Sequence, residues 1–302
     1  MRAGLHIRTI AAMLAELALC GLTSWLALTW WHPLTVVLAM IVIATRQHAL
    51  FILFHDAVHY QVAASHRVND IITNLLIGVP QLVPVQLYRR LHLRHHGTLG
   101  SDADPERLLL YRGQPWQYHA LAAWPLVRQL AGDLLLVNNI RTLIHFQREL
   151  RDPASKLALP PGRLPPELFL NQALFGAALV AFALVDLTTF LRFVLLWFVP
   201  LVTLTQAIQK VRSFAEHAPI DAAELSYSWR PGLFGRLVLW PYHINYHREH
   251  HTHPRVPWYR LPATFPDAVQ RPGRELPRLL WKRLSAADGP PRTPTPPPPP
   301  TR

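Results

Sequence analysis

Four apolar runs in this chain are each long enough to cross a lipid bilayer, and they occur as two close pairs. The runs cover about residues 10–31, 34–54, 168–187 and 190–209. Crossing a hydrocarbon core of roughly 30 Å takes about 20 apolar residues in a helix. Only a few residues separate the two runs of each pair, so each pair should form a helical hairpin. The sequence therefore predicts an all-α integral membrane protein with four transmembrane helices.

The first run could instead be a cleaved signal peptide. Its length argues against this, because the apolar part of a signal peptide covers only about 7–15 residues, and the second run follows at once. Glu16 and Arg46 lie inside the first two runs. Counted from the turn between the runs, they lie at similar depths, and charged groups at membrane depth usually have partners. We predict that Glu16 and Arg46 pair across the hairpin.

Two hairpins would place the segments 55–167 and 210–285 on the same side of the membrane. Lys and Arg avoid the apolar runs and gather in these segments, which is the distribution expected on the cytoplasmic side. The formal charge of +12 is therefore no sign of nucleic-acid binding, and we predict no nucleic-acid partner. We expect a multi-pass protein of a bacterial inner membrane, with both segments forming a cytoplasmic helical cap and both termini in the cytoplasm.

The order of apolar, polar and Pro-rich segments also indicates the domain organisation. Residues 1–285 are predicted to form one membrane domain, in which the four apolar runs alternate with the cap segments and the Pro-rich residues 152–166 form a connector. Residues 286–302 are dominated by proline and are predicted to be a disordered tail.

Histidines gather in three short motifs, HDAVH, HLRHH and HREHH, each close to an apolar segment. Spacings of i, i+3 and i+4 place the rings on one face of a helix. A single HxxxH pair is more often an ordinary surface or core feature, but three motifs on one side of a membrane favour a metal site. One further histidine follows the fourth run. The nine candidate ligands are His55, His59, His92, His95, His96, His217, His247, His250 and His251.

Nine imidazoles are too many for one ion and suit two ions with four or five ligands each. Imidazole binds iron, copper, nickel and zinc, so the composition alone does not name the metal. The single cysteine, Cys20, excludes a site built from several thiolates.

The chain resembles the membrane fatty-acid desaturase and hydroxylase superfamily, and within it the bacterial acyl-lipid desaturases. The resemblance covers roughly residues 34–262 and extends beyond the histidines themselves. Four motifs carry it: RQHALFILFHDAVH (Arg46–His59), YRRLHLRHHGTLGSDADPE (Tyr88–Glu106), RSFAEH (Arg212–His217) and YHINYHREHHTHPRVPWYRLP (Tyr242–Pro262).

This resemblance implies a non-haem di-iron centre, with two iron ions held by the nine histidines and O2 as co-substrate. Such a centre removes hydrogen from an unactivated C–H bond, and no further catalytic side chain is implied. His217 matches an additional ligand position of the family. Some relatives have an Asn four residues before that histidine, which reaches iron through water, where this chain has Ser213.

Residues that support the ligands are also predicted, because a metal-bound histidine usually donates its second ring N–H to a carboxylate or carbonyl. Asp56 and Glu216 are the leading candidates, although helix capping or surface charge would also explain them. Ser213, His243 and Asn245 are further candidates. Weaker candidates are Asp70, Asp102, Asp104 and Glu249.

A long-chain substrate would need an apolar route to the metals. Trp240, Trp258 and Tyr259 are predicted to line this route, although ordinary core or interface positions explain each of them equally well. No flavin, nicotinamide, ferredoxin or cytochrome b5 motif is visible. Electrons should therefore come from a separate donor, such as a ferredoxin, or a cytochrome b5 with its reductase.

The leading interpretation is an O2-dependent acyl-lipid desaturase that acts on a membrane lipid or acyl substrate. A hydroxylase or ketolase of the same superfamily, acting on a carotenoid, sterol, alkane or fatty acid, is the alternative. A membrane haem electron carrier or a metal transporter is a more remote one. Both would need ligands inside the apolar runs, whereas the histidine motifs lie at or beyond the ends of the runs.

Overall fold

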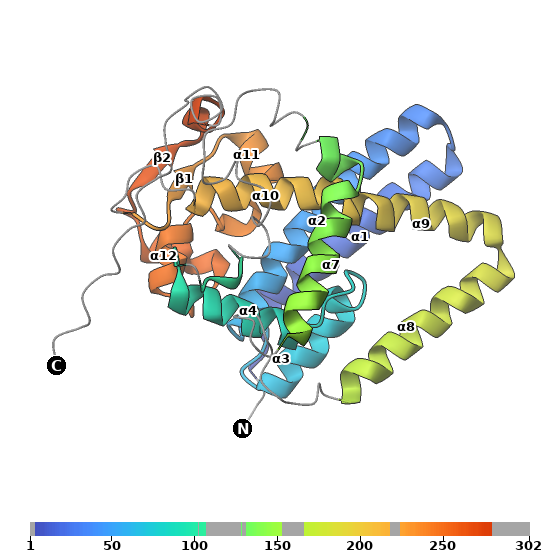
Figure 1. The fold of residues 1–302 in the computed structure, drawn as a ribbon, viewed down its shortest axis with the longest axis horizontal. Coiled ribbons are helices and arrows are strands. Elements are labelled where there is room, and N and C mark those ends of the chain that lie inside the picture. The colour runs from blue at the N-terminus through green and yellow to red at the C-terminus, as the bar shows by residue number, and fades with distance from the viewer. Residues whose placement is uncertain are drawn as a thin grey trace.

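The computed structural model of the 302-residue chain describes residues 4–101, 103–106, 128, 131–152, 166–217 and 224–279. The predicted tail over 286–302 lies outside the described residues. The described part is mostly helical, and Figure 1 shows its helices. The main helices are α1 (Ile7–Thr29), α2 (Pro33–Val58), α3 (His66–Thr73), α4 (Val85–Thr98), α7 (Val137–Arg151), α8 (Pro166–Val185), α9 (Leu187–Val202) and α10 (Leu204–His217). The shorter helices α11 (Leu233–Val238), α12 (His247–Thr252) and α13 (Leu261–Thr264) follow.

Helices α1 and α2 form the first predicted hairpin and lie side by side along their lengths (Figure 1). His32 caps α2, because its Nδ1 accepts a hydrogen bond from the Leu34 backbone N–H at 3.3 Å. The predicted pairing is confirmed, with Arg46 Nη1 3.3 Å from Glu16 Oε1. Glu16 is buried and Arg46 is partly buried at the contact, so each charge has its partner where water is scarce.

The fourth run is broken where the sequence predicted one continuous helix over 190–209. Helix α9 ends at Val202 and α10 begins at Leu204, with Thr203 between them. Pro200 lies inside the last turn of α9, and a proline within a helix removes one hydrogen bond and crowds the preceding turn. The two helices still form an apolar unit of 31 residues from Leu187 to His217.

Among the described residues, three helical units are long and apolar enough to cross a membrane, namely α1, α2 and the α9–α10 unit. Helix α8, in the third predicted run, is a shorter apolar helix over Phe169–Val185, so the span over 168–187 and the total of four spans stay predictions. At 1.5 Å per residue, α2 with 26 residues and α9–α10 with 31 exceed the roughly 30 Å of a hydrocarbon core. This excess length is enough for His55, His59 and His217, at the ends of these helices, to lie outside such a core.

The interrupted apolar stretch before the second histidine motif folds as α3, a π-helical turn over Asn74–Gly78, and α4. The Asn74 side chain stabilises the break, because its Oδ1 accepts the Val85 N–H at 2.8 Å. Ile77 and Val85 are buried in the core formed with α1 and α2. This stretch therefore fixes where α4 begins.

Two short strands correct the all-α prediction. β1 (Ser228–Arg230) and β2 (Gln270–Pro272) pair in parallel, with Trp229 opposite Arg271. Strands of three residues are too short to show an alternating pattern in the sequence. The pair ties the segment that follows the third histidine motif to the segment that precedes it.

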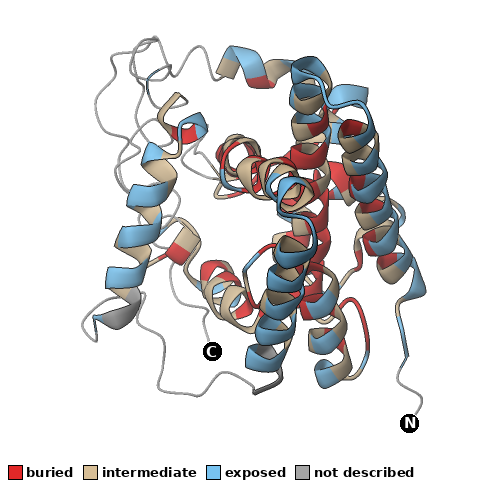
Figure 2. Ribbon diagram, turned by 90° about the vertical axis from the view of Figure 1, so that its right-hand side faces the viewer, coloured by how far each residue is buried: buried red, intermediate tan, exposed pale blue. Residues whose placement is uncertain are grey.

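Two apolar clusters hold the described residues together. The larger cluster joins α1, α2, α4 and α9, and the smaller one joins Ile52 of α2 to Phe214, Trp229 and Trp240. Figure 2 shows the buried faces turned inward, while much of α1 and α8 is exposed on the outside. The exposed outer faces are rich in leucine and valine, as expected of helices that face lipid.

Candidate metal centre

The nine predicted ligands converge from four helices that are distant in the sequence. Helix α2 contributes two histidines at its C-terminal end, His55 inside the helix and His59 as the capping residue. Helix α4 carries the second motif, α10 ends at its histidine, and α12 carries the third motif. The contributions are His55 and His59, then His92, His95 and His96, then His217, and finally His247, His250 and His251.

The histidines divide into two groups by distance. In the five-histidine group, each residue offers a ring nitrogen within 4.8 Å of the others; its members are His55, His59, His92, His96 and His250. The nitrogens of His95, His217 and His251 meet the same limit. His247 joins them, because its Nε2 lies 2.8 Å from His217 Nε2 and 3.0 Å from His251 Nε2. These four residues are the four-histidine group.

The two groups adjoin each other. The rings of His96 and His251 stack with their centroids 4.2 Å apart, and the rings of His95 and His96 are 6.0 Å apart. His92 Nε2 and His96 Nε2 approach to 2.9 Å within the five-histidine group. Helix α4 therefore supplies ligand candidates to both groups and links them.

Several rings are oriented by contacts on their outer side. His95 Nδ1 lies 2.9 Å from Asp104 Oδ1, and His92 Nδ1 lies 3.0 Å from Glu106 Oε1. His217 Nδ1 lies 3.3 Å from the Leu225 carbonyl. A ring that donates its Nδ1–H outward keeps the Nε2 lone pair for the inner side. These contacts therefore aim Nε2 of each ring into the cluster.

Other ring nitrogens are buried without a hydrogen-bond partner among the residues that the structure describes. In the cluster they are both nitrogens of His55, the Nε2 atoms of His59, His95 and His250, and the Nδ1 atom of His247. A buried polar atom without a partner costs free energy on the order of 1–3 kcal/mol. Convergent, unpartnered imidazole nitrogens are what a metal ion with nitrogen ligands requires. The residues present therefore fit a metal centre.

Burial also keeps most of these rings neutral at neutral pH. Burial, with the neighbouring His96, lowers the pKa of His59 to about 3. Burial, with the neighbouring His95, lowers the pKa of His96 to about 4. The pKa values of His92, His247, His250 and His251 are also lowered, first by burial and then by adjacent imidazoles. A neutral imidazole is the form that binds a metal.

His95 is the exception. Burial acts to lower its pKa, but Glu106 and Asp104 together outweigh burial and raise the pKa above the usual value. The two carboxylates thus stabilise positive charge at this point of the cluster. A metal ion would supply the same positive charge in place of the proton.

Asp104 and Glu106 are the supporting residues that the sequence did not identify as leading candidates. Asp104 was only a weak candidate and Glu106 was not one. Both belong to the SDADPE stretch directly after the second motif. The signal available was the presence of carboxylates eight and ten residues after His96, which is common on any surface.

Asp56 and Glu216, the leading supporting candidates, both lie beside the cluster. Asp56 Oδ1 is 3.7 Å from His55 Nδ1, while Oδ2 accepts the Trp258 backbone N–H at 3.0 Å. Glu216 Oε2 is 3.5 Å from His247 Nδ1 and also pairs with Arg212.

The structure places three further candidates differently. Ser213 is buried on α10, one turn before His217. The side chain of Asn245 donates to the Trp229 carbonyl at 2.8 Å and so holds strand β1. His243 lies outside both groups and is exposed. The sequence placed His243 on the same helical face as His247, but left-handed φ angles of 52° at Tyr242 and 55° at His243 break the helix between them.

The predicted route residues occupy two places. Trp240 is buried and stacks on Trp229 with ring centroids 5.6 Å apart, as a core residue would. Trp258 is half-buried against Tyr242 and the larger apolar cluster. Tyr259 packs edge-on against Trp258 and lies under the Arg8 guanidinium. Trp258 approaches the cluster through its backbone N–H, which donates to Asp56 beside His55.

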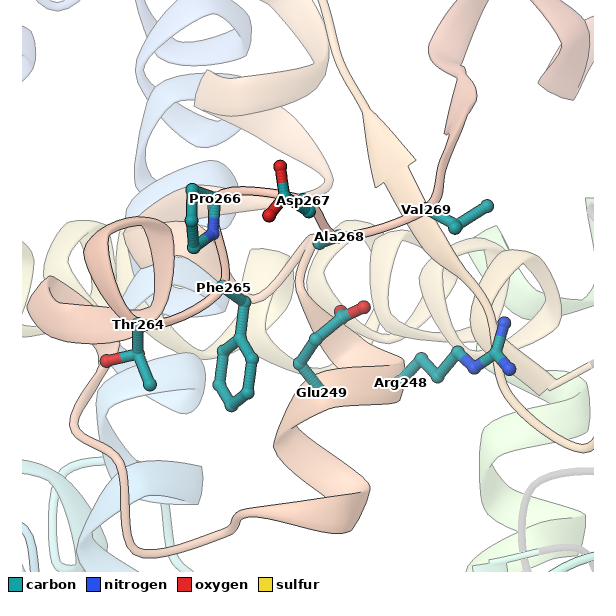
Figure 3. Close-up of a pocket in the computed structure, with 8 residues that line it drawn as sticks. All are labelled: Arg248, Glu249, Thr264, Phe265, Pro266, Asp267, Ala268 and Val269. Atoms are coloured by element: carbon teal, nitrogen blue, oxygen red, sulfur yellow. The ribbon is translucent and has the colours of Figure 1, made fainter.

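A separate pocket of about 370 Å³ lies beside α12. Figure 3 shows it between Arg248 and Glu249 on α12 and the segment from Thr264 to Val269. None of the nine histidines lines this pocket.

Comparison with known proteins agrees with this geometry. The profile of the family described as "Fatty acid desaturase" matches residues 28–281. The chain belongs to this family. Its relatives include desaturases and ketolases of the membrane desaturase and hydroxylase superfamily.

Three relatives illustrate the range. A beta-carotene ketolase of Paracoccus sp. (strain PC1) is 26% identical over 267 residues, covering 85% of this chain and 90% of the relative. A dihydrorhizobitoxine desaturase of Bradyrhizobium elkanii is 26% identical over 289 residues, covering 91% and 78%. A sphingolipid delta(4)-desaturase DES1-like protein of Oryza sativa subsp. japonica is 28% identical over 223 residues, covering 71% and 58%.

Together with the three membrane-length helices, these similarities fit an integral membrane oxidoreductase of the desaturase, hydroxylase or ketolase type. The resemblance inferred from the four sequence motifs is confirmed.

Proposed function

We propose that this protein is an O2-dependent non-haem di-iron enzyme that removes hydrogen from an unactivated C–H bond of a long-chain lipid. The observation that carries the proposal is the convergence of nine imidazoles in groups of five and four, with unpartnered nitrogens facing inward. Two such groups suit two ions better than one, because a single ion cannot take nine ligands.

The proposed ligands are the five-histidine group for one iron and the four-histidine group for the other. Two iron ions with O2 would supply the oxidising power that protein side chains lack. The chain itself contributes the geometry. Asp104 and Glu106 fix the rings of His95 and His92, and burial excludes water from the ring nitrogens and keeps them neutral.

An acyl-lipid desaturase is the reaction that we favour, with a double bond formed in a long acyl chain. Helix α2, which brings His55 and His59 at its end, is apolar over most of its length, so an acyl chain could reach the cluster along it from the bilayer without crossing water. Similarity to two desaturases supports this choice. In the same proposal, the chain has four spans, both termini and the cluster face the cytoplasm, and a ferredoxin or cytochrome b5 delivers the electrons.

A ketolase is the second candidate. The specific observation in its favour is the match to a beta-carotene ketolase over 90% of that protein's length. The histidine arrangement does not separate the two reactions, because both begin with attack on a C–H bond.

Expression in two hosts tests the choice. One host should make saturated acyl lipids and the other should accumulate beta-carotene, and each should be compared with a strain that carries the His250→Ala variant. New double bonds in the acyl chains of the first host alone would support a desaturase. Keto groups on the carotenoid of the second host alone would overturn that choice in favour of the ketolase.

Metal analysis tests the centre itself. The purified protein should contain about two iron ions per chain, as the two groups of ligands require, and should show no haem absorption. A protein that retains only zinc after expression in iron-supplemented cells, and that lacks both activities, would contradict the di-iron proposal.

A further inference from the structure

Helix α11 exposes an apolar surface that the functional site does not explain. Leu233 is 76% exposed, Phe234 is 74% exposed and Leu237 is 50% exposed. None of the six residues of α11 is buried. A cluster of large apolar side chains this exposed normally marks contact with a partner or a membrane.

The position of α11 along α2 bears on whether this surface contacts a protein partner or a membrane. Arg46 Nη2 donates to the Leu237 carbonyl at 2.5 Å, and His48 Nε2 lies 3.1 Å from the Leu239 carbonyl. Just beyond α11, the Tyr242 hydroxyl donates to Glu16 Oε1 at 2.6 Å. The segment from α11 to Tyr242 is therefore attached to the middle of the α1–α2 hairpin, and α11 lies beside α2 (Figure 1).

This attachment lies at hydrocarbon depth. Arg46 comes eight residues before Phe54, the last residue of the second apolar run. At 1.5 Å per residue, it lies about 12 Å inside the end of that run. The outer face of α2 is apolar one turn further in, where Ile41 and Val42 are exposed.

We propose that α11 is a re-entrant segment, inserted into the bilayer leaflet on the side of the histidine cluster, and that Leu233, Phe234 and Leu237 contact lipid acyl chains. The proposal rests on the assignment as an integral membrane protein, and it requires neither the metal nor the reaction. Lipid is the occupant because α11 is attached to α2 at Arg46, about one turn from the exposed apolar residues Ile41 and Val42.

The backbone of α11 meets the requirement of such an environment. Without water, a backbone carbonyl at a helix end needs a partner from the protein. The Leu237 carbonyl, one residue before the end of α11, and the Leu239 carbonyl, just after the helix, take theirs from Arg46 and His48 of α2. The backbone N–H groups of Leu239 and Trp240 both donate to the Gly235 carbonyl, at 3.0 Å and 2.8 Å. Arg236 is the charged residue of α11 and is exposed, and its long stem lets the guanidinium reach toward the headgroups.

The insertion would link the lipid phase to the metal centre. From Tyr242, which is held at the Glu16 level, the chain reaches His247 in five residues. The segment in contact with acyl chains is thus continuous with the one that carries three ligand candidates. A lipid substrate beside α11 would lie next to the chain that leads to the cluster.

Two matched positions test the proposal, because Phe234 and Val269 are equally exposed at 74%. Val269 lines the pocket beside α12 among Arg248, Glu249 and Asp267 (Figure 3) and should face water. In a Cys20→Ser background, the Phe234→Cys and Val269→Cys variants are labelled with bimane in phosphatidylcholine liposomes. Quenching is then measured with brominated acyl chains and with iodide, before and after iron removal.

We expect brominated lipid to quench the label at position 234 at least threefold more than that at position 269, and iodide to show the opposite order. Removal of iron should not change this order, so the result is independent of the proposed enzyme activity. Equal iodide quenching at the two positions would overturn the proposal. Protection of position 234 from both quenchers would also overturn it, because a second protein copy would then cover α11. Should the Phe234→Cys variant fail to fold, the Leu233→Cys variant repeats the measurement.

Discussion

Two buried polar clusters lie along α2, about 14 Å apart between Arg46 and His55, and their chemistry differs. In the first, which we call the Glu16 cluster, Glu16 is paired with Arg46 and accepts the Tyr242 hydroxyl, and Arg46 also donates to the Leu237 carbonyl. The charges of this cluster are satisfied by the chain. In the second, the nine-histidine cluster, several ring nitrogens have no partner within the described residues.

The difference separates structure from function. A buried polar group that is fully paired needs nothing further and serves to hold elements together. A buried group that lacks a partner is unfavourable unless another component supplies one. The Glu16 cluster therefore reads as a structural connection, and the histidine cluster reads as a site for an added ion. The predictions below test this contrast, beginning with the largest expected effect.

Removal of a proposed ligand should abolish function while leaving the fold in place. In the His250→Ala variant, the five-histidine group loses a buried member contributed by α12. We expect activity to fall more than about 100-fold, beyond the 10–100-fold range typical of residues that only support ligands. Bound iron should fall below two per chain, as measured by elemental analysis. The matched control is His253→Ala, because His253 is exposed at the end of the same helix. Equal iron and activity in the two variants would refute the ligand role.

Disruption of the Glu16 cluster should instead reduce stability. The Glu16→Gln and Arg46→Gln variants each leave a buried charge without its partner, which costs roughly 3–5 kcal/mol. The double variant should lose less free energy of unfolding than the two single variants lose together, since no unpaired charge remains. Reversible unfolding in detergent micelles provides the measurement. Additive losses would show that the 3.3 Å contact carries no coupling.

Replacing a carboxylate that contacts a histidine ring on its outer side should have an intermediate effect. In the Asp104→Asn variant, the His95 ring loses the carboxylate that orients its Nδ1. We expect iron affinity to fall 10–100-fold, measured by competition with a chelator, with little change in helix content. Asp267→Asn is the control, because Asp267 is exposed in the pocket beside α12. An unchanged iron affinity in Asp104→Asn would show that burial alone orients His95.

The sequence predicted the parts of these clusters that follow from spacing along a helix. Histidines at i, i+3 and i+4 must share a face, and Glu16 and Arg46 must lie at similar depths in a hairpin. It did not predict which histidines would group, because His95 and His96 are adjacent in the sequence yet belong to different groups. That division depends on how α4 packs between α2 and α12.

Local backbone geometry also escaped prediction. The sequence around His243 has the spacing of a helix, but the left-handed φ angles at Tyr242 and His243 exclude the latter from the cluster. Neither residue is a glycine, and histidine is only several-fold enriched at positive φ, so the residue types give at most a weak signal of the break. The Tyr242 hydroxyl reaches Glu16 across this turn, which suggests a tertiary reason for the conformation.

The Tyr242→Phe variant isolates that last contact and should have the smallest effect. It removes one hydrogen bond to Glu16 and leaves the ring packed on Trp258. We expect a loss of about 1 kcal/mol in the free energy of unfolding, within the range of single hydrogen bonds in proteins and membranes. Iron content should remain at the wild-type level, since the histidine cluster is untouched. The same substitution in the Glu16→Gln background should cost less, because its charged acceptor is gone. A loss of iron in Tyr242→Phe would mean that the turn at Tyr242 positions His247, and that the two clusters are not independent.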